Sequence, residues 1–256
     1  MRIDRKRFTA VTVFAVAMPL ALSAAAASAA PEFGRCTKVA AGTGAFATRN
    51  CTSEGGERRY AWQPGVARRG FTGAGGEATL DTSKFGLTLK CTSETSTGEY
   101  SGTTTVTNVV IALHGCEEVF PAGPCSTTGA ADGEVVSHPL SGTLGVTRRS
   151  PEGPAKNRIG LMLSSADGIF AEYNCPPAFP NVLRGSVIGP VLANVMSSSP
   201  MRNFKSTGSR QSPERFEGGP RASLESSIER EPFEPVALRL QSRQSNEERL
   251  EVNSVF

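Results

Sequence analysis

Two histidines are the residues best suited by type to do chemistry near neutral pH, because an unperturbed imidazole titrates there. His114 precedes Gly115-Cys116, and His138 precedes Pro139, which favours an extended backbone. Nucleophilic catalysis would need one of them beside a hydroxyl and a carboxylate. The chain has no G-x-S-x-G elbow. We therefore predict sheet or surface histidines, and retain both as ligand-binding candidates only.

The carboxylates give no catalytic or metal-binding pattern. Beyond residue 29 the chain has three aspartates, Asp81, Asp132 and Asp167, and adjacent Glu117 and Glu118 point to opposite sides of an extended chain. No acid pair with the separation needed for glycoside hydrolysis and no calcium-binding loop is evident. The sequence predicts no catalytic residue, no cofactor and no metal ligand.

Tyr60 and Trp62 are two residues apart, so a strand would place them on one face. Exposed, they would form a small sugar- or peptide-binding platform; buried, they would anchor a local core. Burial is the favoured interpretation, and both residues stay ligand-binding candidates.

The first thirty residues and the cysteines define the compartment. Four basic residues lead into an apolar run, 8–22, which ends in Ala27-Ser28-Ala29, the layout of a secretory signal peptide. We predict cleavage after Ala29, with Ala27 and Ala30 as neighbouring alternatives. The product is then secreted, or associated with the cell envelope, and is not stably inserted in a membrane.

All six cysteines lie beyond the leader, which indicates three disulfides in an oxidising compartment. Sequence alone permits fifteen pairings. Local spacing favours the pairs Cys36–Cys51 and Cys116–Cys125, since each would close a short turn region. Cys91 and Cys175 then remain to join distant strands.

Charge argues against polyanion binding by the chain as a whole. Removal of 1–29 takes away four basic residues and one acid, which leaves 23 of each sign. A neutral chain has no global field that attracts nucleic acid or anionic lipid. We expect no nucleic-acid partner, and an extracellular or envelope ligand if there is any.

Short β-branched or alternating runs, separated by Gly, Pro, Ser and Asn, recur from residue 58 onward. They predict one all-β domain over 30–256, an antiparallel β-sandwich or barrel with long loops. The clearest strand is 103–114. Gly185 is predicted to mark a bulge. The stretch 205–235 is rich in Ser, Arg, Glu and Gly and is predicted as a flexible loop region, although 222–226 has a strand pattern.

Several stretches resemble uncharacterised exported proteins of actinobacterial type: 31–36, 91–100, 185–189 and the segment from Asn246 to Ser254. The resemblance spans most of the chain after the leader. It implies export and β structure, and it carries no known activity.

Together these features predict a non-catalytic extracellular or envelope-associated protein with a binding or structural role. Two alternatives stay open: a secreted hydrolase with a site built from scattered loops, and a carbohydrate-binding module that uses Tyr60 and Trp62.

Overall fold

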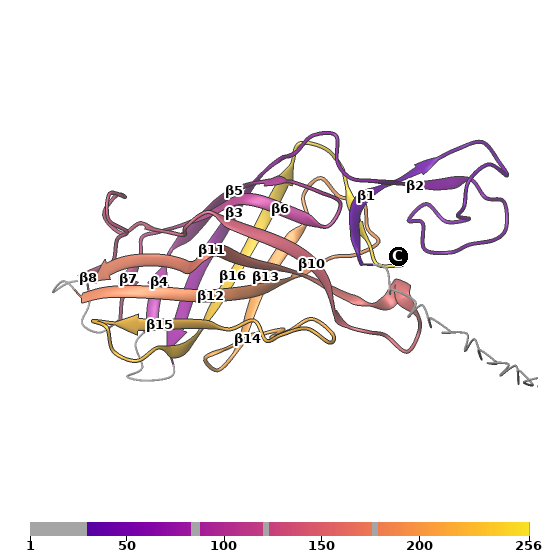
Figure 1. The fold of residues 1–256 in the computed structure, drawn as a ribbon. Helices are drawn as coiled ribbons and strands as arrows, with labels where there is room; N and C mark the ends of the chain where they lie inside the picture. The colour runs from indigo at the N-terminus through magenta and orange to yellow at the C-terminus, as the bar shows by residue number, and fades with distance from the viewer. Residues whose placement is uncertain (1–29, 83–87, 120–122, 176–178, 256) are drawn as a thin grey trace, which may run out of the picture.

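The computed structural model describes residues 30–82, 88–119, 123–175 and 179–255 (Figure 1). The predicted signal peptide, 1–29, lies outside these residues. The predicted all-β, antiparallel fold class is confirmed: the described chain consists of strands, turns and one short 3-10 helix, η1 (Pro154–Lys156).

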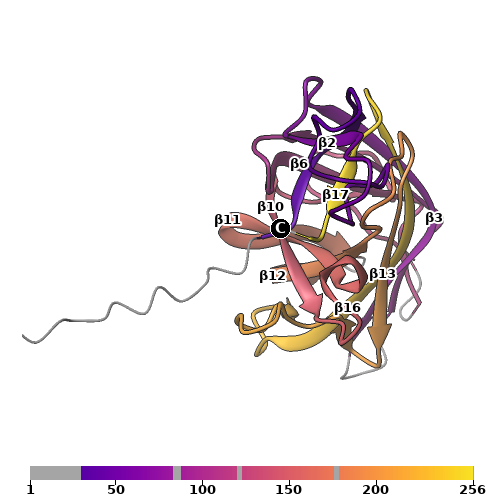
Figure 2. The same ribbon diagram turned by 90° about the vertical axis from the view of Figure 1, so that its right-hand side faces the viewer.

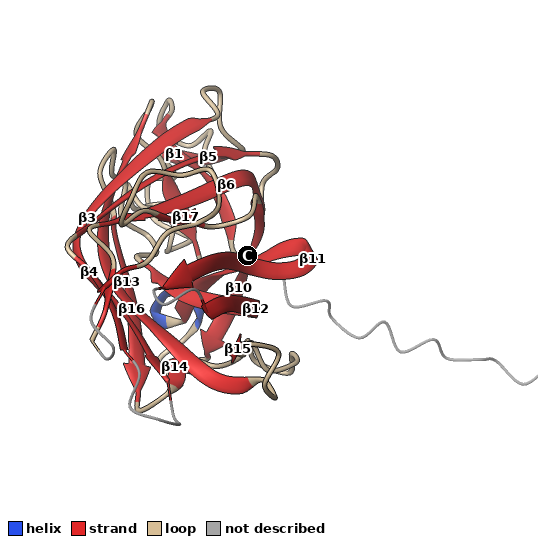
Figure 3. Cartoon of the chain, turned by 90° about the vertical axis from the view of Figure 1, so that its left-hand side faces the viewer, coloured by secondary structure: helices blue, strands red, loops and turns tan. Residues whose placement is uncertain are grey.

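Eight strands are hydrogen-bonded in a ring, so the main sheet closes on itself. Every neighbouring pair in the ring is antiparallel, and the ladder between β16 and β3 completes it. In ring order the strands are β3 (Gly70–Thr82), β5 (Ser93–Tyr100), β6 (Thr105–His114), β10 (Leu140–Arg148), β11 (Arg158–Cys175), β12 (Phe179–Val191), β15 (Leu224–Ile228) and β16 (Glu234–Asn246). Figure 3 shows β3 and β16 in one wall, with β10, β11 and β12 across from them.

Period-two alternation explains the core of this closed sheet. Along β16, Leu238, Leu240 and Ser242 are buried, whereas Arg239 and Gln241 between them are exposed. The other ring strands add their inward residues to the same apolar cluster. The predicted strand 103–114 contains β6, and its Val109, Ile111 and Leu113 face this core. Val106 is buried as well, so the alternation is interrupted before Val109, where Asn108 has a φ of +52°.

Six shorter strands extend the ring at its edges. β13 pairs with the second half of β16, and β4 pairs with the second half of β3. The six added strands are β4 (Thr88–Cys91), β7 (Glu117–Glu118), β8 (Gly123–Pro124), β9 (Val135–Val136), β13 (Met201–Thr207) and β14 (Arg210–Ser212). The region 205–235, predicted as a loop, therefore contains β14 and β15. The predicted strand at 222–226 overlaps β15.

Residues 30–69 form an amino-terminal lobe at one end of the closed sheet (Figures 1 and 2). Its strands β1 (Glu32–Lys38) and β2 (Tyr60–Pro64) pair with each other, and β1 also pairs with the last strand, β17 (Glu251–Asn253). Phe33 of β1 packs edge-on against Tyr100, with ring centroids 4.8 Å apart, and so joins the main core.

The disulfides confirm one predicted pair and correct two. Cys36–Cys51 is formed as predicted, but the other pairs are Cys91–Cys116 and Cys125–Cys175. The predicted pairs Cys116–Cys125 and Cys91–Cys175 are wrong.

Strand register is the reason for the correction. Ser93 pairs with His114, so two residues further along the same ladder Cys91 faces Cys116. Ser126 likewise pairs with Asn174, which sets Cys125 opposite Cys175. Cys116 and Cys125 are indeed neighbours, since the backbone N–H of Cys125 donates to the carbonyl of Cys116, but their sulfurs bond elsewhere.

Candidate functional site

A groove of about 450 Å³ lies on the outer face of the closed sheet. We call it the β3–β16–β13 groove, after the strands that form it. Its polar lining residues, all but Ser206 at alternate positions of their strands, are Glu77, Thr79, Asn203, Lys205, Ser206, Arg239 and Gln241. Phe204 and Leu240 also line it, although both side chains belong to the buried core.

A bulge explains why the groove lies at this place. The β16–β3 register shifts between Leu240 and Ser242, so that Gly76 and Glu77 of β3 face a single residue of β16. At the same point β3 changes its other partner from β5 to β4. A bulge bends the strand and increases the local twist, which hollows the outer face here.

The groove carries both charges and several neutral hydrogen-bonding groups. Asn203 and Gln241 are direct cross-strand partners, as are Thr79 and Arg239. The Arg239 side chain is 65% exposed and lies 4.0 Å from Asp81. The Thr79 hydroxyl has no hydrogen-bond partner within the described protein. Such a surface offers donors and acceptors side by side on rigid strands.

His114 forms part of a chain of three groups on the outer face. Its Nε2 lies 2.9 Å from Oγ1 of Thr95 on the adjacent strand, and its Nδ1 lies 3.5 Å from Oε1 of Glu134. Thr95 is exposed, and the other two side chains are partly exposed. The order hydroxyl, imidazole, carboxylate is the one that nucleophilic catalysis uses.

His138 lies between two carboxylates instead. Its Nδ1 is 2.9 Å from Asp167 and its Nε2 is 3.6 Å from Glu172. The hydroxyl of Ser165 donates to Asp167 rather than meeting the imidazole. Hydrogen bonds from Ser165 and from the Ile169 backbone, and then from His138, lower the pKa of Asp167 to about 2. Because both ring nitrogens face carboxylates, His138 is not placed to activate a hydroxyl.

Tyr60 and Trp62 lie on one face of β2, as predicted, and are half-buried. They pack against a small core of Cys36, Phe46 and Cys51. The Trp62 ring covers Gly34, where a Cβ atom would approach it to 2.6 Å, and its Nε1 donates to Glu32. The pair thus anchors the lobe and still keeps part of its surface in solvent.

A polar cluster inside the closed sheet was missed by the sequence analysis. Gln244 links Tyr100, Asn246 and Arg202 through side-chain hydrogen bonds, and the Tyr100 hydroxyl donates to Asn246 at 3.0 Å. Burial raises the pKa of Tyr100 and lowers that of Arg202. Glu94, 2% exposed, faces the same interior with one oxygen unpaired.

Glu251 is the most perturbed interior acid. It lies on β17, is 2% exposed and has a buried oxygen without a partner. Burial raises its pKa to about 7. Glu251 and Arg202 line a cavity of about 20 Å³, and Glu94 and Arg202 line a second one of the same size. Each has room for about one water molecule, so this interior is a structural network rather than a ligand pocket.

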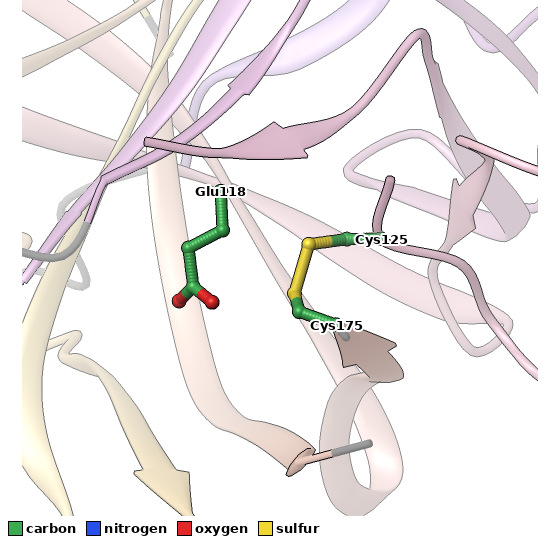
Figure 4. Close-up of side chains that lie close together, drawn as sticks. All are labelled: Glu118, Cys125 and Cys175. Atoms are coloured by element: carbon green, nitrogen blue, oxygen red, sulfur yellow. A yellow bond between two sulfur atoms is a disulfide. The ribbon is translucent and has the colours of Figure 1, made fainter. Parts of the chain in front are cut away.

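One group in the described residues has the composition of a metal site, namely Glu118, Cys125 and Cys175. Figure 4 shows the two sulfurs joined to each other beside the Glu118 carboxyl group. Bonded cysteines offer no thiolate to a metal ion. Burial raises the pKa of Glu118, which fits an acid packed against a disulfide.

Comparison of the chain with protein-family models, curated proteins and solved structures found no match. The resemblance to exported actinobacterial proteins therefore stays a prediction. Within the described residues, no helix has the length and hydropathy that crossing a membrane requires.

Proposed function

We propose that this chain is a non-catalytic extracellular binding protein whose ligand is a saccharide held in the β3–β16–β13 groove. The signal-peptide pattern and three disulfides support an extracellular location. The observation that carries the proposal is the groove of about 450 Å³, which lies on rigid, hydrogen-bonded strands.

The lining selects the ligand class. Glu77 accepts hydrogen bonds, Lys205 and Arg239 donate them, and the amides of Asn203 and Gln241 do both. A ligand that matches donors and acceptors at such close spacing must itself carry groups that do both, as hydroxyls do. The mixed charges favour a neutral molecule over a strongly charged one. A chain of sugar residues has this chemistry.

The test is calorimetric titration with neutral hexasaccharides: cellohexaose, chitohexaose and maltohexaose. We expect saturable binding of at least one of them. Replacing Asn203→Ala and Gln241→Ala together should weaken it at least tenfold, because each lost hydrogen bond costs about 1 kcal/mol. Arg243→Ala, an exposed change on the same strand outside the lining, is the matched control. Equal affinity in both variants, or no binding of any of the three, contradicts the proposal.

A second candidate function is ester or amide hydrolysis, and the Thr95–His114–Glu134 arrangement favours it. In that reaction the Thr95 hydroxyl would attack a carbonyl carbon while its proton passes to Nε2 of His114, and Glu134 would orient the ring. The imidazole would then give this proton to the departing alcohol or amine as its bond to the carbonyl carbon breaks. Water, deprotonated by the same nitrogen, would release the acyl group from Thr95 as the free acid. Turnover of p-nitrophenyl acetate by the purified protein, lost in both Thr95→Val and His114→Gln, would support this function. Turnover that persists in both variants would exclude this site.

A further inference from the structure

The neutral net charge conceals a separation of charge along the molecule. The lobe, 30–69, has seven basic and three acidic residues, a net charge of +4. Residues 70–256 have 16 basic and 20 acidic residues, a net charge of −4. Because the lobe occupies one end of the fold (Figure 1), the protein has a positive end and a negative body.

Several of the lobe's cations are free to meet a ligand. Arg35 pairs with Glu248, and Arg59 pairs with Glu57. Lys38, Arg49 and Arg58 are exposed, and no carboxylate of the described residues lies within ion-pair distance of them. These three cations are part of the accessible charge of the lobe; Arg68 and Arg69, where the lobe joins β3, are also exposed.

Aromatic surface lies beside one of these cations. Lys38 is the direct cross-strand partner of Tyr60, and Trp62 follows on the same face of β2. The Cys36–Cys51 disulfide and Phe46 support this face from below. The lobe therefore presents half-buried rings and a free ammonium group on one rigid surface.

We propose that this lobe face, built from Lys38, Tyr60 and Trp62 and assisted by the exposed cations Arg49 and Arg58 of the same lobe, docks the protein on an acidic polysaccharide. Sugar rings pack on the aromatic side chains, and carboxylate or phosphate groups of the polymer pair with the cations. The negative body is repelled by the same polymer, so only the lobe end approaches it. This surface is distinct from the groove and adds a second ligand.

The exposed apolar residues argue against a membrane as the partner. The large hydrophobic side chains that are exposed in the described chain are Val119, Leu192 and Val195. None belongs to 30–69; Leu192 and Val195 line a small cavity with Phe33, where the lobe joins the closed sheet, and not the face of Lys38, Tyr60 and Trp62. A lobe that inserted into a bilayer interface would need such residues at its surface. Its partner is therefore a hydrated polymer that carries negative charge.

The test uses the full secreted chain and polygalacturonate as the probe. Trp62 is the single tryptophan, so its fluorescence reports on this face alone. We expect a saturable change in emission that weakens as salt rises, because exposed charges are screened. Dextran, a neutral polymer, should produce none. The triple variant Lys38→Gln, Arg49→Gln, Arg58→Gln should weaken binding at least tenfold.

The matched control removes three exposed cations of the body: Lys90→Gln, Arg148→Gln and Arg210→Gln. Equal weakening by this variant would overturn the proposal. So would tighter lobe-dependent binding to duplex DNA or to phosphatidylglycerol vesicles, or a salt-sensitive self-association that the lobe variant abolishes. The Asn203→Ala, Gln241→Ala groove variant should keep full polygalacturonate affinity, so failure at one site is distinguishable from failure at the other.

Discussion

Single residues decide how stability depends on pH. Glu251 has a pKa of about 7 in the folded chain, against 4.5 for an ordinary glutamate, because burial disfavours its charge. The folded state thus binds a proton that the unfolded chain has already released between these values. Its stabilising effect is complete below about pH 4.5 and is lost as the pH rises through 7.

Glu251→Gln should remove this dependence. Between pH 5 and pH 8 we expect the unfolding free energy of the native chain to fall by about 2 kcal/mol from this group. Over that interval the glutamine variant should lose about 2 kcal/mol less than the native chain, as measured by urea unfolding at several pH values. Glu247→Gln, an exposed change close by in sequence, is the control and should keep the native slope. An equal slope in Glu251→Gln and in the native chain would contradict the assignment.

Residue patterns also set the limit of what the sequence could predict about the site. Glu94, Ser96 and Tyr100 of β5 all face inward, yet the outward positions of the same strand are polar too. No hydrophobic alternation marks the inner face, so a buried glutamate cannot be distinguished there from a solvated one. The groove was likewise invisible, because it depends on a register shift between strands 160 residues apart in sequence.

At the scale of elements, strand identity could be predicted and strand pairing could not. Alternation located β6 and the strand at 222–226, because it is a local property. The disulfide prediction failed for Cys91, Cys116, Cys125 and Cys175. Short spacing in sequence favoured a Cys116–Cys125 bond, whereas the strand register places each of these two cysteines opposite a different partner. In this fold Cys91 and Cys175 end strands, Cys116 and Cys125 lie just beside strand pairings, and the register of those pairings selects the partners.

The corrected disulfides have a measurable consequence. Peptide mapping of the oxidised chain by mass spectrometry should recover Cys91 with Cys116 and Cys125 with Cys175; a Cys116–Cys125 peptide would contradict the register.

The Cys91–Cys116 and Cys125–Cys175 bonds close separations of 25 and 50 residues. On the chain-entropy model, their removal by paired serine substitutions should cost about 3.5 and about 4 kcal/mol respectively in urea unfolding.

Gly185, predicted to mark a bulge, lies on β12 opposite a register irregularity whose extra residues are on β11, between Ser164 and Ile169. Its φ is +104°, a conformation that side chains rarely adopt, and a Cβ there would lie 2.0 Å from the carbonyl oxygen of Ser223. Gly185→Ala should therefore destabilise the protein by about 2 kcal/mol or more. Gly129→Ala isolates the backbone effect, since its φ is +89° with open space around it, and should cost about 1 kcal/mol. Equal melting temperatures for both variants would show that the Ser223 contact is not limiting.

At the scale of the whole molecule, two cores of very different size share one chain. The closed sheet has a continuous apolar cluster, whereas the distal part of the lobe has only Cys36, Phe46 and Cys51, with the half-buried rings of Tyr60 and Trp62 packed against them. Glu248 fixes the base of the lobe: it pairs with Arg35 and accepts hydrogen bonds from the backbone of Ala67 and Arg68. Burial would raise the pKa of Glu248, but these hydrogen bonds and the positive charges of Arg35 and Arg68 lower it.

This division predicts that the distal lobe opens independently. The Cys36–Cys51 bond closes a separation of 15 residues, which is worth about 3 kcal/mol on the chain-entropy model, and the small core has little else. In the Cys36→Ala, Cys51→Ala variant, amides of 39–64 should lose hydrogen-exchange protection. Those of the β3–β16 ladder should keep it, and so should Phe33, because its ring is part of the main core. Uniform loss of protection across both regions would contradict this prediction, because it would mean that the lobe and the closed sheet unfold as one unit.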